Sequence, residues 1–120
     1  MPEVNWWKAL FAAVDGKNTS AFLKFLTPDA EFRFAKAPAA FGHAAVGESV
    51  EGFFGAIGSS AHTLNRTWQD EDSAICEGTV TYTRLDGSEL TVPFANVFYM
   101  RDGLIARYLI FIDQGDLFAA

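Results

Sequence analysis

The sequence is short of basic residues and of cysteine. It has 9 lysines and arginines against 15 aspartates and glutamates, so its formal net charge is −6. An acidic chain attracts neither phosphate backbones nor anionic membranes, which argues against nucleic-acid binding. The single cysteine, Cys76, cannot form a disulfide within the chain, and no cysteine or histidine is spaced to bind zinc with it. The plainest interpretation of Cys76 is a small buried apolar residue.

The chain also lacks targeting, membrane and cofactor motifs. Its N-terminus has no basic region of the kind that opens a secretory signal, and no apolar run approaches the roughly 18 residues of a membrane span. The glycines are scattered, so neither a phosphate-binding loop nor a nucleophile elbow is present. We therefore expect a cytoplasmic protein that uses no cofactor and no metal and has no membrane partner.

Apolar and aromatic residues, in contrast, are abundant. Half of the 120 residues are apolar, and 12 phenylalanines, 3 tryptophans and 3 tyrosines are among them. Such a composition excludes disorder, and the length fits one domain over residues 1–120. The aromatic content predicts that these side chains fill a large core or line a large cavity.

Hydrophobic periodicity divides the chain into a helical half and a strand half. The three-to-four spacing of apolar residues predicts helices, and Gly16 and Pro28 end the first two of them. We predict helices over 4–14, 21–26 and 47–58, a half-buried strand over 29–35 and a loop over 35–45. These segments precede a region in which the period changes from about 3.6 to 2.

From Ala61 onward the chain alternates as a strand does, interrupted by three turn signals. These are Glu71-Asp72, Asp86-Gly87 and Asp102-Gly103, each interpreted as a two-residue hairpin turn. The result is an antiparallel meander of four strands. Helices and a meander together predict an α+β fold in which three helices cover one face of a curved sheet.

The turns also predict which residues share a face of the sheet. Two-residue turns would pair Asn65 with Gly78, Tyr82 with Thr91 and Val97 with Tyr108. The face that contains these residues is mostly small, with three tyrosines, so it can accommodate the helices and leave room for a ligand. No carboxylate projects onto it.

The opposite face of the predicted sheet is rich in phenylalanine. It collects Phe94, Phe98, Met100, Leu109 and Phe111. Three helices cannot cover both faces, and an exposed apolar patch of this size is unusual in a monomer. We therefore expect a homodimer formed through the outer face of the sheet.

Two segments carry a resemblance to a known family: residues 46–54 (VGESVEGFF) and residues 97–108 (VFYMRDGLIARY). In their order and spacing they resemble the nuclear transport factor 2-like (NTF2-like) superfamily, in particular its polyketide-cyclase-like (SnoaL-like) branch, which also contains ketosteroid isomerases and limonene epoxide hydrolase. The resemblance implies a cystatin-like α+β barrel, in which a cone-shaped, curved mixed or antiparallel sheet wraps around three N-terminal helices. It also implies an apolar pocket inside the cone and, as in many members, dimerisation through the outer sheet face.

The family's catalytic residues are not found at the corresponding positions. The resemblance implies that the general base of ketosteroid isomerases falls at Phe34 and their oxyanion-stabilising tyrosine at or near Leu10. The aspartate of epoxide hydrolases and polyketide cyclases falls at Ile110, and the hydrolases' Arg-x-Asp falls near Gly78 and Val80. We therefore expect a protein that binds a small hydrophobic molecule without the known catalytic residues.

The ligand pocket is expected to draw residues from the helices and from the small-residue face. We predict that it is lined by Trp7, Phe11, Phe34, Phe53, Asn65, Cys76, Tyr82, Val97, Tyr108 and Ile110. The plainer alternative is that the tyrosines only pack the barrel.

Candidates for acid–base chemistry are few. His43 lies in the alanine-rich loop, where it could close over the pocket as a general base, although a solvated loop histidine is the plainer interpretation. His62 projects to the outer face, and Asp113 and Asp116 are interpreted as a strand end and a cap.

An enzyme therefore remains an alternative function: an isomerase, cyclase or hydrolase of a small hydrophobic substrate. A purely structural or protein-interaction dimer is a third. A bulge that shifts a strand by one residue would flip its faces and bring different groups inward. A carboxylate inside the cone within about 3 Å of a histidine or tyrosine would favour the enzyme.

Overall fold

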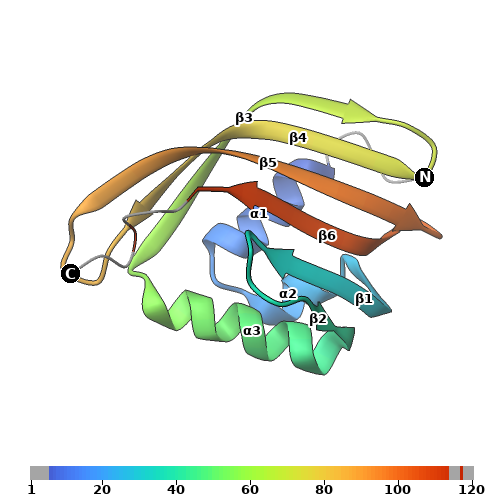
Figure 1. Cartoon of the computed structure of the whole chain (residues 1–120), viewed down its shortest axis with the longest axis horizontal. Helices are drawn as coiled ribbons and strands as arrows, with labels where there is room; N and C mark the ends of the chain where they lie inside the picture. The colour runs from blue at the N-terminus through green and yellow to red at the C-terminus, as the bar shows by residue number, and fades with distance from the viewer. Residues whose placement is uncertain (1–5, 114–116, 118–120) are drawn as a thin grey trace.

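Three helices pack against one side of a six-stranded sheet in the computed structural model, which describes residues 6–113 and Leu117 (Figure 1). The elements are α1 (Trp6–Asp15), α2 (Thr19–Leu23), β1 (Leu26–Phe34), β2 (Ala40–Phe41), α3 (Gly42–Ala56), β3 (Ser59–Gln69), β4 (Ser73–Thr83), β5 (Glu89–Arg101) and β6 (Leu104–Ile112). The strand order is β2-β1-β6-β5-β4-β3, with β1 parallel to β6 and every other pair antiparallel. The predicted α+β architecture with a curved, mixed sheet is confirmed, and the sheet is not closed into a complete barrel.

The first helix forms where the sequence predicts it, whereas the second begins two residues and ends three residues earlier than predicted. Helix α1 ends immediately before Gly16, and the Asn18 side chain caps α2 by accepting a hydrogen bond from the Ala21 backbone N–H at 3.1 Å. Both Trp6 and Trp7 are buried, with ring centroids 4.2 Å apart. Their bulk fixes α1 against the sheet.

The region between the second and third helices differs from the prediction. Helix α3 begins at Gly42, because the alanines expected in a loop are strong helix formers and supply the first turn of the helix. Strand β1 begins at Leu26 and contains Pro28. Proline has no N–H to donate, and the pairing of β1 with β6 is irregular between Leu26 and Glu31.

The four-stranded meander is confirmed as β3 to β6, but one of its turns is longer than predicted. The β4–β5 loop has three residues, Leu85 to Gly87, closed by a hydrogen bond from the Arg84 N–H to the Ser88 carbonyl at 2.7 Å. Gly87 adopts a φ of 89°, as the third residue of such a loop does. Tyr82 therefore pairs with Leu90 instead of Thr91, and β5 is turned over relative to the prediction.

A bulge in β6 makes this inversion compatible with the predicted turn that follows. Arg101 pairs with Leu104 around Asp102-Gly103, as predicted, but the register shifts at Ala106. Tyr108 consequently pairs with Phe98 instead of Val97. The inward face of β6 is the predicted one.

A second bulge, at Asn65 in β3, inverts the faces of the N-terminal half of that strand. Thr67 pairs with Cys76 as predicted, whereas Leu64, not Asn65, lies opposite Gly78. A β-carbon at Gly78 would lie 1.9 Å from the Thr63 carbonyl oxygen, so only glycine permits this close approach. The bulge carries His62 to the inner face, where the sequence had predicted the outer one.

The inversion of β5 also changes the outer face of the sheet. Phe94 and Phe98 are 5% and 0% exposed and belong to the core, so the predicted patch of phenylalanines is wrong at these two positions. An apolar row replaces it, because the register places Trp68, Ile75, Val97 and Leu109 side by side across four strands. Among the described residues, no helix is long and apolar enough to cross a membrane.

Candidate functional site

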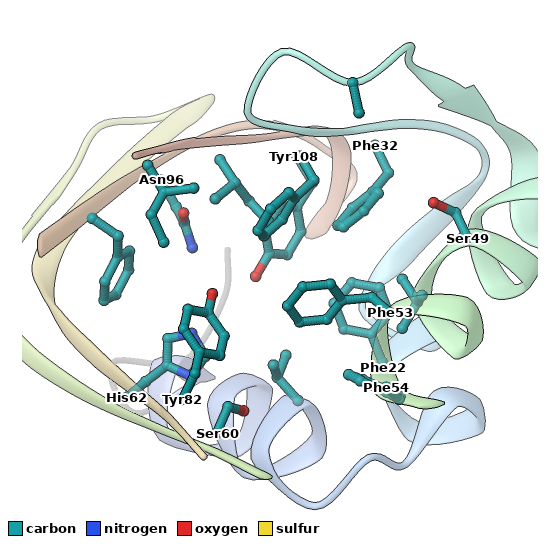
Figure 2. Close-up of a pocket in the computed structure, with 17 residues that line it drawn as sticks. Phe22, Phe32, Ser49, Phe53, Phe54, Ser60, His62, Tyr82, Asn96 and Tyr108 are labelled. Atoms are coloured by element: carbon teal, nitrogen blue, oxygen red, sulfur yellow. The ribbon is translucent and has the colours of Figure 1, made fainter. Parts of the chain in front are cut away.

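A cavity of about 230 Å³ lies inside the curve of the sheet, between its inner face and the helices (Figure 2). Much of its wall is aromatic. The phenylalanines that line it are Phe22, Phe32, Phe34, Phe53, Phe54 and Phe94. Such a lining excludes water and favours an apolar ligand.

Most of the polar side chains of the lining come from the sheet. Four successive strands contribute them: Ser60 and His62 from β3, Tyr82 from β4, Asn96 from β5 and Tyr108 from β6. Figure 2 shows the two tyrosine hydroxyls pointing toward the middle of the cavity, with the Asn96 amide beside them. The cavity therefore combines an aromatic lining with several groups that can form hydrogen bonds.

His62 is held by a carboxylate from the opposite layer. Its Nδ1 lies 2.6 Å from Oδ1 of Asp15, the last residue of α1, and its backbone N–H donates to Oδ2 of Asp15 at 2.9 Å. The Ser60 hydroxyl donates to Asp15 Oδ1 at 2.8 Å. Asp15 sits behind the imidazole and does not itself line the cavity. A carboxylate at the negative end of a helix is locally unfavourable, and these three hydrogen bonds offset that cost.

The electrostatics of the pair define the histidine tautomer. Burial would raise the pKa of the Asp15 carboxyl, but the hydrogen bonds and charge of His62 and the Ser60 hydroxyl outweigh it and hold that pKa below its ordinary value. An ionised carboxylate can only accept, so His62 Nδ1 carries the hydrogen. In a neutral imidazole, Nε2 is then the basic atom.

The two tyrosines remain hydrogen-bond donors at neutral pH. Burial raises the pKa of Tyr82 and of Tyr108, and the nearby Asp15 charge adds to the effect in both. Neither hydroxyl forms a hydrogen bond within residues 6–113 or to Leu117. Both are available to a bound molecule.

Asn96 is a deeply buried polar residue of the lining, as Tyr82 and Tyr108 are. It is 2% exposed, and its Oδ1 has no hydrogen-bond partner in the described part of the chain.

Five of the residues predicted to bind the ligand do lie on the cavity: Phe34, Phe53, Tyr82, Tyr108 and Ile110. Their contact with a ligand remains a prediction.

The other five lie elsewhere. Trp7 and Phe11 belong to the core, with the Phe11 ring 4.8 Å from that of His62. Cys76 is fully buried outside the lining, and burial raises the pKa of its thiol to about 12. Asn65 is the exposed bulge residue, and Val97 faces outward because β5 is inverted.

The predicted acid–base candidates are not at the cavity. His43 lies in the first turn of α3, with its Nε2 3.1 Å from the Leu26 carbonyl oxygen. Asp113 is exposed in a groove at the end of β6, and Asp116 lies outside the described residues. No group of three or more metal-ligating side chains occurs in the part of the chain that the structure describes.

Sequence comparison identifies the family to which this chain belongs. The SnoaL-like domain family matches residues 7–108, most of the chain. The chain is a member of the SnoaL-like family. No curated protein is significantly similar to it in sequence.

Solved structures of SnoaL-like and related proteins share the fold. TerC, co-crystallised with polyporic acid, is 22% identical, with a TM-score of 0.83 over 94% of this chain and 92% of its own. A putative polyketide cyclase from Pseudomonas putida KT2440 is also 22% identical, with a TM-score of 0.81 over 97% of this chain and 95% of its own. An LEH-like epoxide hydrolase from M. tuberculosis is 16% identical, with a TM-score of 0.78 over 96% of this chain and 85% of its own. At these identities the likeness to the putative polyketide cyclase and to the epoxide hydrolase shows a shared fold.

Proposed function

We propose that this SnoaL-like protein is an enzyme that moves a proton at a carbon next to the carbonyl group of a small hydrophobic substrate. The Asp15–His62 pair at the cavity wall is the observation that carries this proposal. It supplies a base inside an apolar pocket, from a histidine that the sequence analysis had placed on the outer face. This places the isomerase or cyclase alternative ahead of simple binding.

The geometry supports a short reaction sequence. His62 Nε2 takes a proton from the carbon next to the carbonyl, the electron pair of the C–H bond forms the C=C bond of an enolate, and the π pair of the C=O bond moves onto the oxygen. Asp15 stays ionised, orients the ring and stabilises the imidazolium that forms. Tyr82 and Tyr108 donate hydrogen bonds to the enolate oxygen, where the negative charge develops.

The enolate can then react in two ways without any further reagent. In an isomerisation, the imidazolium returns the proton to a different carbon of the substrate. In a cyclisation, the enolate carbon attacks a second carbonyl of the same molecule, and the imidazolium protonates the resulting alkoxide. The name of the putative polyketide cyclase with the same fold agrees with the second course.

Cavity size limits the substrate. An apolar cavity of roughly 150 Å³ takes up benzene. A cavity of about 230 Å³ therefore suits a molecule with one or two rings. Larger polycyclic substrates would require the cavity walls to move.

The test is deuterium exchange into small ketones. Cyclohexanone, 2-cyclohexenone and acetophenone are incubated in D₂O with the protein, and loss of the α-proton signals is followed by NMR. We expect the wild type to exceed the buffer rate for at least one ketone. His62→Gln should lose about 10² to 10⁴ of that rate enhancement, the range typical of one acid–base group.

A second candidate function is ligand binding without a reaction, which the aromatic lining favours on its own. It predicts that a ketone binds to the wild type and exchanges no faster than in buffer. That result would contradict the proposed enzyme and leave a carrier or sensor of small apolar molecules.

A further inference from the structure

Asn96 is a costly residue at the position it occupies. It lies in the middle of β5, opposite Cys76 on one side and Ile110 on the other, and its inward-facing neighbours on the same strand are Phe94 and Phe98. An apolar side chain would suit these surroundings better. An amide oxygen that is buried without a partner loses its hydrogen bonds to water and gains none in return.

The direction of the side chain indicates what compensates for this cost. Asn96 lines the cavity, and Figure 2 shows its amide on the same side as the hydroxyls of Tyr82 and Tyr108. Polar residues at positions that suit an apolar side chain are characteristic of binding sites, where a ligand completes the hydrogen bonds.

We propose that Asn96 determines the substrate class by pairing with a hydroxyl group on the ligand. The inference rests on the proposed function for the site: the two tyrosines are assigned to the carbonyl oxygen, which leaves Asn96 for a second polar group. A hydroxyl both donates and accepts, so it can pair with either end of an amide. The substrate is then a hydroxylated ketone with one or two rings.

This pairing gives discrimination as well as affinity. A ligand without the hydroxyl would fill the cavity and shut Asn96 away from water with nothing to bond. Sites built to hydrogen-bond a hydroxyl therefore reject the analogue that lacks it far more strongly than apolar sites separate molecules by size.

The test compares acetophenone with its 2-, 3- and 4-hydroxy isomers by calorimetric titration of the wild type. We expect at least one isomer to bind about tenfold or more tightly than acetophenone. In Asn96→Leu, which keeps the branched shape of the side chain and is apolar, that ratio should fall to about one. Equal affinities in the wild type, or a ratio that survives in Asn96→Leu, would overturn the proposal.

Ile110→Val is the matched control, because Ile110 pairs with Asn96 across the ladder and lines the same cavity. It should weaken all four ligands to a similar degree and keep the ratio. If Asn96→Leu does not fold, the wild-type ratio and the shift of the Asn96 side-chain NH₂ resonance on titration decide. That resonance should move with the preferred isomer and much less with acetophenone.

The same titration in His62→Gln separates this inference from the proposed function. The hydroxyl preference should persist there, although proton exchange is lost. A protein that prefers the hydroxylated ligand and catalyses no exchange would support the role of Asn96 and contradict the enzyme. A protein that catalyses proton exchange but binds the hydroxylated ligands no better than acetophenone would support the enzyme and contradict the role of Asn96.

Discussion

Nδ1 of His62 lies 2.6 Å from Oδ1 of Asp15, although the two residues are 47 positions apart in the sequence. The contact joins the end of α1 to the inner face of β3, so it exists only in the folded chain. Protonation of the Asp15 carboxyl should therefore change the stability of the protein.

The pair predicts a specific dependence of stability on pH. The pKa of Asp15 is lower in the folded chain than its ordinary value of 3.8, so the unfolded chain binds the proton more readily. Stability from Asp15 is present above the unfolded pKa and is lost as pH falls through the folded one. Asp15→Asn should destabilise the protein at pH 7 and do so less at about pH 3. Urea unfolding at both pH values measures this.

Glu48→Gln is the control for that comparison, because Glu48 is exposed on α3. It should change stability little at either pH. An Asp15→Asn variant whose deficit is as large at low pH as at pH 7 would contradict an ionised, hydrogen-bonded Asp15.

Gly78 should be intolerant of any side chain. A β-carbon would meet the Thr63 carbonyl oxygen at 1.9 Å and force the backbone of β3 away next to His62. Gly78→Ala is expected to cost about 1 to 3 kcal/mol, as overpacking does, and to reduce proton exchange. Gly52→Ala, in the interior of α3 with no atom within 4 Å of the added carbon, should instead be neutral or stabilising by up to about 1 kcal/mol. Thermal unfolding of both variants tests the contrast, and equal effects would refute it.

The tyrosine hydroxyls should matter for chemistry and not for folding. Because neither has a hydrogen-bond partner within the described residues, Tyr82→Phe and Tyr108→Phe should change the free energy of unfolding by less than about 0.5 kcal/mol. Ketone exchange should fall by about 10² or more in at least one of them, the usual effect of removing a donor to a developing oxyanion. A large loss of stability with unchanged exchange would assign the hydroxyls to the core.

We propose a homodimer through the outer sheet face, on a set of residues that keeps Leu109 and Phe111 and loses the buried Phe94 and Phe98. Trp68, Ile75, Tyr99 and Phe111 are exposed there, and the apolar row runs across four strands. Sedimentation should give a dimer at micromolar concentration, and Ile75→Glu should give a monomer. Leu85→Glu is the control, because Leu85 is 72% exposed in the β4–β5 loop. A monomeric wild type would refute the dimer.

The sequence was sufficient for the order of the elements. Periodicity, Gly16 and the three turn positions placed two helices and four strands within a few residues of their observed bounds. These signals are local, and local signals predict elements well.

The faces of the strands were harder, because side chains alternate with a period of two. One extra residue in the β4–β5 loop and single bulges at Asn65 and Ala106 sufficed to move His62 and Asn96 inward. Two signals pointed to this arrangement. Gly78 in mid-strand is typical of a bulge or a close backbone approach, and Phe94 and Phe98 are larger and more apolar than Pro93, Ala95 and Val97, which favours burying the phenylalanines.

Asp15 could not be assigned from the sequence at all. It reads as an ordinary polar residue at the end of a helix, and its role depends on a partner in β3. Only the packing of α1 against the sheet brings the two together.

The most direct measurement of the central claim compares two histidine variants in the ketone exchange assay. His62→Gln removes the base at the cavity, whereas His43→Gln removes the only other histidine, which contacts the Leu26 carbonyl away from the cavity. With the best ketone of the panel, we predict that His43→Gln keeps the wild-type rate and that His62→Gln falls to within about tenfold of buffer. Equal rates in the two variants, whether both are lost or both retained, would contradict the assignment of His62 as the base.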